Sequence, residues 1–173
     1  MKWGGTLDIE YRKAVAADAE MMLEHLNTVG GETDNLSYGE NTFLISVEKE
    51  AKFIDKFCKN ESDVMYVALC DGKIVGNAIV EHNRISRYSH RAEISLTVLR
   101  EYWGRGVGSH LMEMMINFAI ENGIELLYLE ARADNERAIS LYKKFGFVKS
   151  GEIPKFFKIN GEYFGCVTMT LEL

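Results

Sequence analysis

Residues 93–120 read EISLTVLREYWGRGVGSHLMEMMINFAI, and this stretch decides the fold. It begins with the alternation of apolar and polar residues that is typical of a β-strand. It continues through a turn with three alternate glycines, Gly104, Gly106 and Gly108, and ends in an amphipathic helix. Backbone amides at the start of a helix are unpaired and carry partial positive charge. A strand, a glycine-rich turn and a helix in this order therefore predict a phosphate-binding site.

The composition indicates an ordinary globular protein. With 173 residues, 47% of them hydrophobic, the chain is expected to form a single domain, residues 1–173, around one sizeable core. The net charge of −6 argues against a nucleic-acid partner. No stretch reaches the roughly 18 apolar residues that cross a bilayer, and the N-terminus has no signal-peptide pattern, so we expect no membrane association.

Cysteine and histidine spacing gives no sign of a metal site or a disulfide framework. Cys58, Cys70 and Cys166 are far apart and odd in number, which fits a reducing cytoplasm, and we therefore expect a cytoplasmic protein without metal. The histidines have no ligand-like spacing and are expected on the surface or in helices: His25, His82, His90 and His110.

The N-terminal part predicts a strand and two helices. A strand is expected over residues 7–14, followed by a helix with Asp18 as its N-cap. Residues 29–44 are rich in Gly, Asn, Thr and Ser and are expected to form a long connector, either a surface loop or a substrate lid. Ser46 is expected to cap the second helix.

The remaining elements alternate between strands and helices, which is typical of an α/β protein. Asp71-Gly72 separates two apolar runs and predicts a tight β-hairpin. The strand that ends at Val98, the helix after the glycine turn and a strand over residues 124–131 form a βαβ unit, whose strands should be parallel neighbours. A helix over residues 135–145 and two strands around Asn160-Gly161 complete the chain.

Two common phosphate-binding families do not fit the turn. A P-loop ends in Gly-Lys-Ser/Thr, whereas this turn ends in Gly108-Ser109-His110 and has no lysine. A dinucleotide-binding fold requires G-x-G-x-x-G on an early strand, whereas here Ser109 occupies the last position about a hundred residues into the chain.

A third family fits in two places. The segment Trp103–Gly108 matches the Arg/Gln-x-x-Gly-x-Gly/Ala motif except at Trp103, and DNERAISLYKKFGF, residues 134–147, matches a second motif in the right order. On these motifs the chain resembles the GNAT N-acetyltransferase family over residues 7–171. The resemblance implies an α/β GNAT acyl-CoA N-acyltransferase fold: a mixed, mostly antiparallel sheet with a central parallel strand pair and helices on both faces.

The resemblance also implies acetyl-CoA as co-substrate. The diphosphate would be held by the amides of the turn, with Arg105 either adding charge or remaining solvated, over residues Gly104, Arg105, Gly106, Val107, Gly108 and Ser109. Leu96 and Val98 would offer main-chain groups to the pantetheine arm, with the Val98 amide as oxyanion hole. Asn135 would contact the same arm, act as an N-cap, or do both.

Three residues are candidates for catalysis. Tyr142 lies two helical turns after Asn135 and would protonate the leaving thiolate, unless it is only a core aromatic. Because an amine with a pKa near 10 is protonated at neutral pH, a base is required. The resemblance favours Glu130 as the base, with pairing to Arg132 or Arg137 as its alternative role, and Glu93 is the second candidate.

The function implied is acetyl transfer from acetyl-CoA to a primary amine by direct attack. The acceptor would be a small amine or a peptide amino terminus. The resemblance allows a homodimer, because dimers are common among such proteins, and the sequence leaves the oligomeric state open. The alternative is a catalytically inactive module that binds acetyl-CoA as a sensor or as a structural element.

Overall fold

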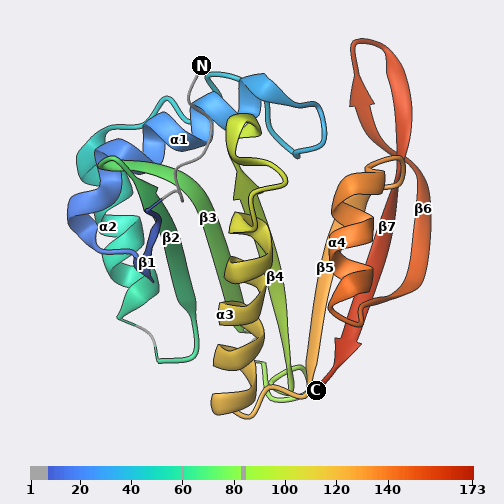
Figure 1. Ribbon diagram of the computed structural model, residues 1–173. Helices are drawn as coiled ribbons and strands as arrows, with labels where there is room; N and C mark the ends of the chain where they lie inside the picture. The colour runs from blue at the N-terminus through green and yellow to red at the C-terminus, as the bar shows by residue number, and fades with distance from the viewer. Residues whose placement is uncertain (1–7, 60, 83–84) are drawn as a thin grey trace.

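The computed structural model describes residues 8–59, 61–82 and 85–173. A seven-stranded sheet runs through the molecule in the order β1-β2-β3-β4-β5-β7-β6 (Figure 1). The strands are β1 (Glu10–Lys13), β2 (Val64–Cys70), β3 (Lys73–His82), β4 (Arg91–Val98), β5 (Leu126–Arg132), β6 (Val148–Ile159) and β7 (Glu162–Glu172). The α-helices are α1 (Ala19–Glu32), α2 (Val47–Cys58), α3 (Val107–Glu121) and α4 (Glu136–Lys144).

The pairing of the strands confirms the predicted sheet. β4 and β5 pair in parallel, whereas the other neighbours pair antiparallel. The parallel pairing covers three positions, from Arg91 opposite Leu126 to Glu93 opposite Tyr128. Beyond Glu93 the two strands diverge toward their C-terminal ends, so that the sheet is split on one side (Figure 1).

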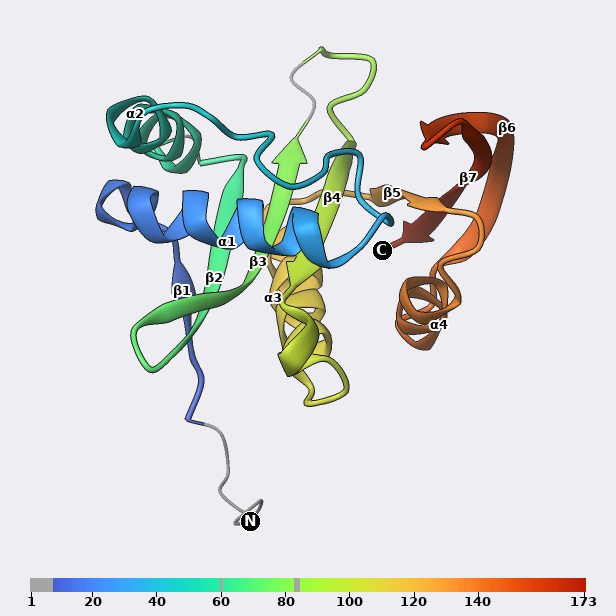
Figure 2. The same ribbon diagram turned by 90° about the horizontal axis from the view of Figure 1, so that it is seen from above.

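Helices cover both faces of the sheet, as expected from the family resemblance (Figure 2). α3 and α4 pack on one face, where Leu111, Met115 and Leu129 belong to the larger apolar core. α1 and α2 pack on the other face over the first strands, where Met22 and Ile54 belong to a smaller core. Because side chains alternate along a strand, each central strand contributes to both faces.

The sequence signals for the two hairpin turns and for the cap of α2 are confirmed. Asp71 and Gly72 both have positive φ values, 50° and 74°, as a two-residue hairpin turn requires. Asn160-Gly161 repeats the same geometry between β6 and β7. The Ser46 hydroxyl accepts a hydrogen bond from the Lys49 amide at 3.3 Å and caps α2.

The expected start of the long connector is wrong. α1 continues through Val29–Gly31 and ends at Glu32, so the α1–α2 loop covers residues 33–46. Packing explains this extension: a Cβ atom on Gly30 would lie 2.5 Å from the carbonyl oxygen of Gly39, so the loop lies directly on the end of α1. The Phe43 amide also donates to the side chain of Asn27. Tertiary contacts thus override the low helix propensity of two glycines.

The N-terminal elements also differ in detail from the sequence-based expectation. β1 begins at Glu10, and residue 7 of the expected strand lies outside the described residues. Asp18 occupies the N-cap position of α1, but its carboxylate makes no capping hydrogen bond to the helix. It accepts instead from Arg12 and from the Val15 amide at 2.7–2.8 Å, and thereby ties β1 to the start of α1.

No helix in the described part of the chain is long and apolar enough to cross a membrane.

Candidate active site

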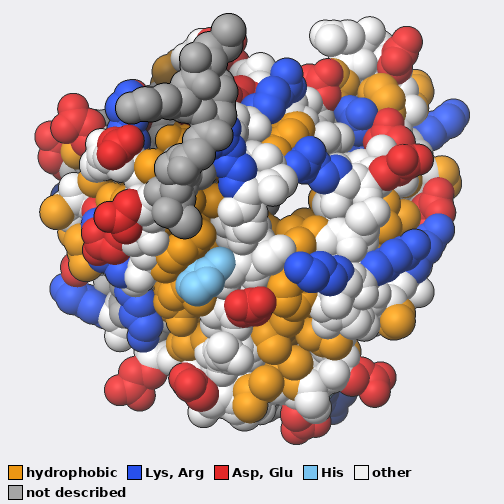
Figure 3. Space-filling model, viewed as in Figure 1, with side chains coloured by type: hydrophobic (Ala, Val, Ile, Leu, Met, Phe, Trp, Pro, Cys, Tyr) orange, Lys and Arg blue, Asp and Glu red, His pale blue; other side chains and the backbone are white. Residues whose placement is uncertain are grey.

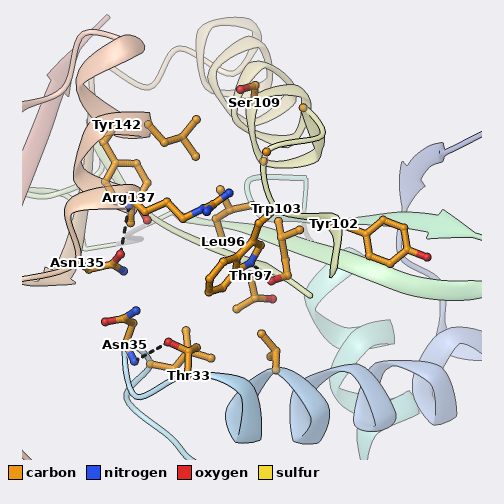
Figure 4. A pocket seen from close by; sticks show the side chains of 18 of the residues that line it. Thr33, Asn35, Leu96, Thr97, Tyr102, Trp103, Ser109, Asn135, Arg137 and Tyr142 are labelled. Atoms are coloured by element: carbon orange, nitrogen blue, oxygen red, sulfur yellow. Dashed lines mark hydrogen bonds between the residues drawn. The ribbon is translucent and has the colours of Figure 1, made fainter. Parts of the chain in front are cut away.

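A cavity of about 510 Å³ opens where β4 and β5 diverge. It is bounded by β4, the glycine turn, the first turn of α3, α4 and the start of the α1–α2 loop (Figure 4). Figure 3 shows the molecular face hollowed at this divergence, with Lys and Arg side chains around the hollow. Several predicted site residues line it: Leu96, Val98, Gly104, Gly106, Gly108, Ser109, Asn135 and Tyr142.

Four predicted site residues do not line this cavity. Val107, the first residue of α3, is buried in the larger apolar core. The guanidinium of Arg105 lies 5.9 Å from the Tyr102 ring instead, and the Arg105 amide is directed to the Tyr102 carbonyl at 3.4 Å. Glu93 and Glu130 lie on the sheet face opposite α3 and α4.

The glycine turn presents backbone to the cavity. A short 3₁₀ turn, Arg100–Tyr102, separates it from β4. Gly104 and Gly106 have φ values of +73° and +87°, which side chains other than glycine adopt with strain. A Cβ atom on Gly106 would meet no atom within 4 Å, so the backbone is open at this point.

The start of α3 leaves amides free to bind an anion. α3 begins at Val107 with Gly106 as N-cap, and the His110 amide makes the first helical bond, to the Gly106 carbonyl. The amides of residues 107–109 therefore precede the regular helical pattern. Together with the helix dipole they favour a phosphate at the mouth of the cavity.

Trp103, the departure from the family motif, has a structural role. Its indole Nε1 donates to the Val98 carbonyl at 2.7 Å, and the Arg137 guanidinium lies 4.7 Å from its ring centre. The turn is thereby tied to the end of β4 and to α4. The cavity-lining set contains the basic residues Arg137 and Lys144 and, within the described part of the chain, no Asp or Glu. The charge of the lining therefore suits an anionic ligand.

The backbone of β4 directs every second amide away from β3. The Leu99 amide donates to the Val75 carbonyl on β3 at 3.0 Å. Because successive amides of a strand point in opposite directions, the amides of Leu96 and Val98 are directed away from β3, toward the gap beside β5. Free main-chain groups at this gap can bind an extended ligand as a strand would.

Asn135, the N-cap of α4, and Tyr142 within α4 both line the cavity (Figure 4). The Asn135 side chain accepts from the Ala138 amide at 3.2 Å, which confirms its N-cap role, and it also lines the cavity. Tyr142, two turns further, is only 9% exposed and packs near Phe147. Burial raises the pKa of Tyr142 to about 12, so the phenol keeps its proton at neutral pH and can donate it.

Glu93 and Glu130 flank a tyrosine on the opposite face of the sheet. The Tyr128 hydroxyl donates to Glu93 at 3.0 Å. Burial, followed by the negative charge of Glu93, raises the pKa of Tyr128, and Glu130 adds to this effect. The predicted alternative pairing of Glu130 with Arg132 is not what the structure shows: the Arg132 guanidinium pairs with Asp134 at 2.6 Å. Glu130 is exposed.

The α1–α2 loop forms one wall of the site. Thr33, Asn35 and Leu36 line the cavity opposite α4 (Figure 4). The Asp34 carbonyl accepts from Arg132 at 3.1 Å, so the loop is attached to the C-terminal end of β5. Sequence reasoning predicted a loop here but could not identify its contact with β5.

The described residues contain no group of three or more His, Cys, Asp and Glu side chains that could hold a metal ion. The two cysteines whose side chains are described, Cys70 and Cys166, are buried and free.

Comparisons with known proteins agree with this geometry. The model of the acetyltransferase (GNAT) family matches residues 33–147, which is more than half of the chain. The chain belongs to this family.

Three similar proteins illustrate the relationship. The spermidine N(1)-acetyltransferase of Escherichia coli K12 is 33% identical over 119 residues, which are 68% of this chain and 62% of that protein. The L-amino acid N-acetyltransferase AaaT of the same organism is 30% identical over 125 residues, which are 71% of this chain and 76% of that protein. A GNAT acetyltransferase from Streptococcus pneumoniae has a TM-score of 0.92 at 28% identity, covering 96% of this chain and all of that one.

Proposed function

We propose that the protein transfers the acetyl group of acetyl-CoA to a primary amine. The observation that carries this proposal is the helix N-terminus, open at Gly106, that faces the mouth of the cavity between the diverging β4 and β5. A diphosphate suits the free amides of residues 107–109 and the basic side chains beside them. The continuous sheet from β1 to β7 supports treating the chain as one acetyltransferase domain.

The geometry supports a role for main-chain groups in binding the rest of the coenzyme. The amides of Leu96 and Val98 are directed toward the gap beside β5, where an extended pantetheine arm would take the place of a strand. Asn135 can contribute from α4, because its side-chain nitrogen is not used by the N-cap bond, which occupies the oxygen.

In the chemical step the nitrogen of the amine forms a bond with the thioester carbon, and the carbon–sulfur bond breaks. The carbonyl oxygen carries negative charge in between, and the Val98 amide would stabilise that charge. The nitrogen loses its second proton to solvent as the amide forms. Tyr142 gives its proton to the departing thiolate and regains one from solvent. Its high pKa means that the thiolate, whose acid has a pKa of about 8.5, needs favourable geometry to take that proton.

A carboxylate must accept the proton that the ammonium form of the amine loses. We assign this to Glu130, with Glu93 as the second candidate, and the proton travels through water because neither residue lines the cavity. Glu130 is exposed to solvent and its expected partner Arg132 is engaged with Asp134. Glu93 already accepts a hydrogen bond from Tyr128, so part of its carboxylate is engaged.

The acceptor we propose is a small amine that carries positive charge. Glu93 and Glu130 place two carboxylates on the face of the β4–β5 pair opposite α3 and α4, and the chain has a net charge of −6. The spermidine acetyltransferase is among its relatives. A peptide amino terminus is the second candidate, and it would be received by the wall formed by the α1–α2 loop.

The test is an acceptor screen. The purified protein is incubated with acetyl-CoA and a panel that includes polyamines, amino acids and short peptides, and free thiol is measured together with product mass. We expect thiol release that depends on at least one amine. Binding of acetyl-CoA without thiol release from any acceptor would instead support the sensor alternative, and absence of binding would contradict both.

A further inference from the structure

His25 is a buried histidine that neither the family motifs nor the proposed reaction uses. It lies on α1, so it is one of the histidines that the sequence allowed in a helix, and it is only 2% exposed. Its Nδ1 lies 3.1 Å from the Ile74 carbonyl oxygen, and its Nε2 lies 2.9 Å from the Thr97 hydroxyl. The ring therefore connects α1 to β3 and β4 at once. Thr97, in turn, lines the cavity.

The two contacts decide which ring nitrogen carries the proton. A carbonyl oxygen can only accept a hydrogen bond, so Nδ1 must carry the proton that binds Ile74. Burial lowers the pKa of His25 to about 4, so the ring is neutral at pH 7 and has one proton only. Nε2 is therefore an unprotonated acceptor.

The protonation state of His25 determines the direction in which the Thr97 hydroxyl points its proton. Because Nε2 can only accept, the Thr97 hydroxyl must donate its single proton to it. The oxygen of Thr97 is then left with lone pairs alone, and it can only accept hydrogen bonds from a molecule in the cavity. A threonine without this partner could rotate its proton toward the cavity and act as donor or acceptor.

The place of Thr97 makes this polarity relevant to the amine. Thr97 lies between Leu96 and Val98, whose amides face the gap where the thioester is proposed to lie. Its side chain is on the α1 side of the sheet (Figure 4). An attacking amine must direct its lone pair at the carbonyl carbon, and its N–H groups therefore point elsewhere.

We propose that His25 is a positioning residue that holds Thr97 as an obligatory hydrogen-bond acceptor for an N–H group of the attacking amine. The inference rests on the proposed acetyltransferase function and adds one element to it. Thr97 touches the amine, whereas His25 acts only through Thr97. The device orients the nucleophile, and the proton of the amine still goes to the carboxylate proposed above.

The experiment combines kinetics with a spectroscopic measurement. Thr97→Val keeps the shape of the side chain and removes the hydroxyl, whereas Thr97→Ser retains it. We expect Thr97→Val to lower kcat/KM for the amine about tenfold, the scale of one hydrogen bond, with the Kd of acetyl-CoA within about twofold. Thr97→Ser should recover most of the rate. The matched control is Thr170→Val on β7, outside the cavity lining, which should behave as the wild type.

Nitrogen NMR of the histidine rings tests the tautomer without any turnover. We expect a neutral His25 with the proton on Nδ1 in the wild type, and a changed Nε2 shift in Thr97→Val. A proton on Nε2 would overturn the inference, because Thr97 could then turn its own proton to the cavity.

If Thr97→Val has the same kcat/KM for the amine as the wild type, the inference is overturned. The proposed function is unaffected by that result, because both proteins still acetylate the amine. If the wild type acetylates no amine at all, it is the proposed function that fails, and the role assigned to Thr97 fails with it.

Discussion

At the scale of single residues, Tyr142 separates chemistry from binding. Tyr142→Phe keeps the buried ring against Phe147 and removes only the hydroxyl. We expect kcat to fall roughly 100-fold, as general-acid catalysis is lost, while the Kd of acetyl-CoA changes little. Steady-state kinetics and calorimetry on the same preparation measure both. An unaltered kcat would show that this tyrosine is only a core aromatic.

The role of Glu130 as the base can be tested by the pH dependence of kcat in a variant that lacks its carboxylate. Without a base, the enzyme depends on amine that is already deprotonated, and this fraction grows as the pH approaches the amine's pKa of about 10. Glu130→Gln should therefore lower kcat roughly 100-fold at pH 7, and the difference from the wild type should shrink steadily at higher pH. The matched variant is Glu93→Gln, on the neighbouring strand. The variant with the larger loss of kcat at pH 7 identifies the base. Equal losses of kcat that do not change with pH would exclude both residues as the base.

The residues that sequence reasoning missed are those whose contacts depend on the tertiary fold. The Trp103 indole bonds Val98 and stacks with Arg137, and the His25 ring bonds Thr97, 72 positions later. Neither contact leaves a periodic or compositional signal. In contrast, the N-cap role of Asn135 was predictable because a cap depends on residues within one helical turn.

At the scale of elements, the glycine turn and α3 form a single anion-binding unit. Gly106→Glu introduces a left-handed non-glycine residue at φ +87° and a negative charge at the mouth of the cavity. We expect calorimetry to detect no binding of acetyl-CoA. Gly123→Glu is the matched control: it lies just past the other end of α3 with φ +69° and open space around it. It should share the backbone strain and still bind, and equal loss in both variants would mean that strain alone is responsible.

The end of α1 offers a second pair of matched variants. Replacing a helical glycine by alanine usually stabilises a helix by about 1 kcal/mol. A Cβ atom on Gly30 would lie 2.5 Å from the Gly39 carbonyl oxygen, whereas one on Gly31 would meet only the flexible side chain of Glu40, at 3.2 Å. We expect Gly30→Ala to destabilise the protein by roughly 1–2 kcal/mol and to raise KM for the amine, because the loop wall shifts.

Gly31→Ala should be neutral or stabilising in the same denaturation experiment. Equal stability of the two variants would contradict the close packing of the loop on α1. Residues 29–31 are helical because of this packing. Their glycine-rich sequence alone predicts a loop, because the packing partner is not visible in it. The hairpins and the βαβ unit were predictable because their turns depend only on neighbouring residues.

At the scale of the whole molecule, His25 should make the free energy of unfolding depend on pH. The pKa of His25 is lowered from 6.5 to about 4 by burial, so the unfolded chain binds a proton between these values that the folded protein does not. Stability is therefore fully present above about pH 6.5 and decreases as the pH falls toward 4. A shift of this size corresponds to a loss of about 3 kcal/mol.

Asp18 acts in a lower window than His25. Its hydrogen bond with Arg12 holds the pKa of Asp18 below 3.8, so this carboxylate contributes above that value and its contribution is lost only at lower pH. Urea denaturation between pH 4 and pH 7 therefore avoids Asp18, and it measures His25 together with Glu50, whose pKa is raised by burial and whose contribution has the opposite sign. We expect His25→Gln to flatten the pH dependence in this window, although the variant is less stable at pH 7. His90→Gln, an exposed control, should keep the wild-type slope, and a slope that persists in His25→Gln would assign the acid sensitivity to another group.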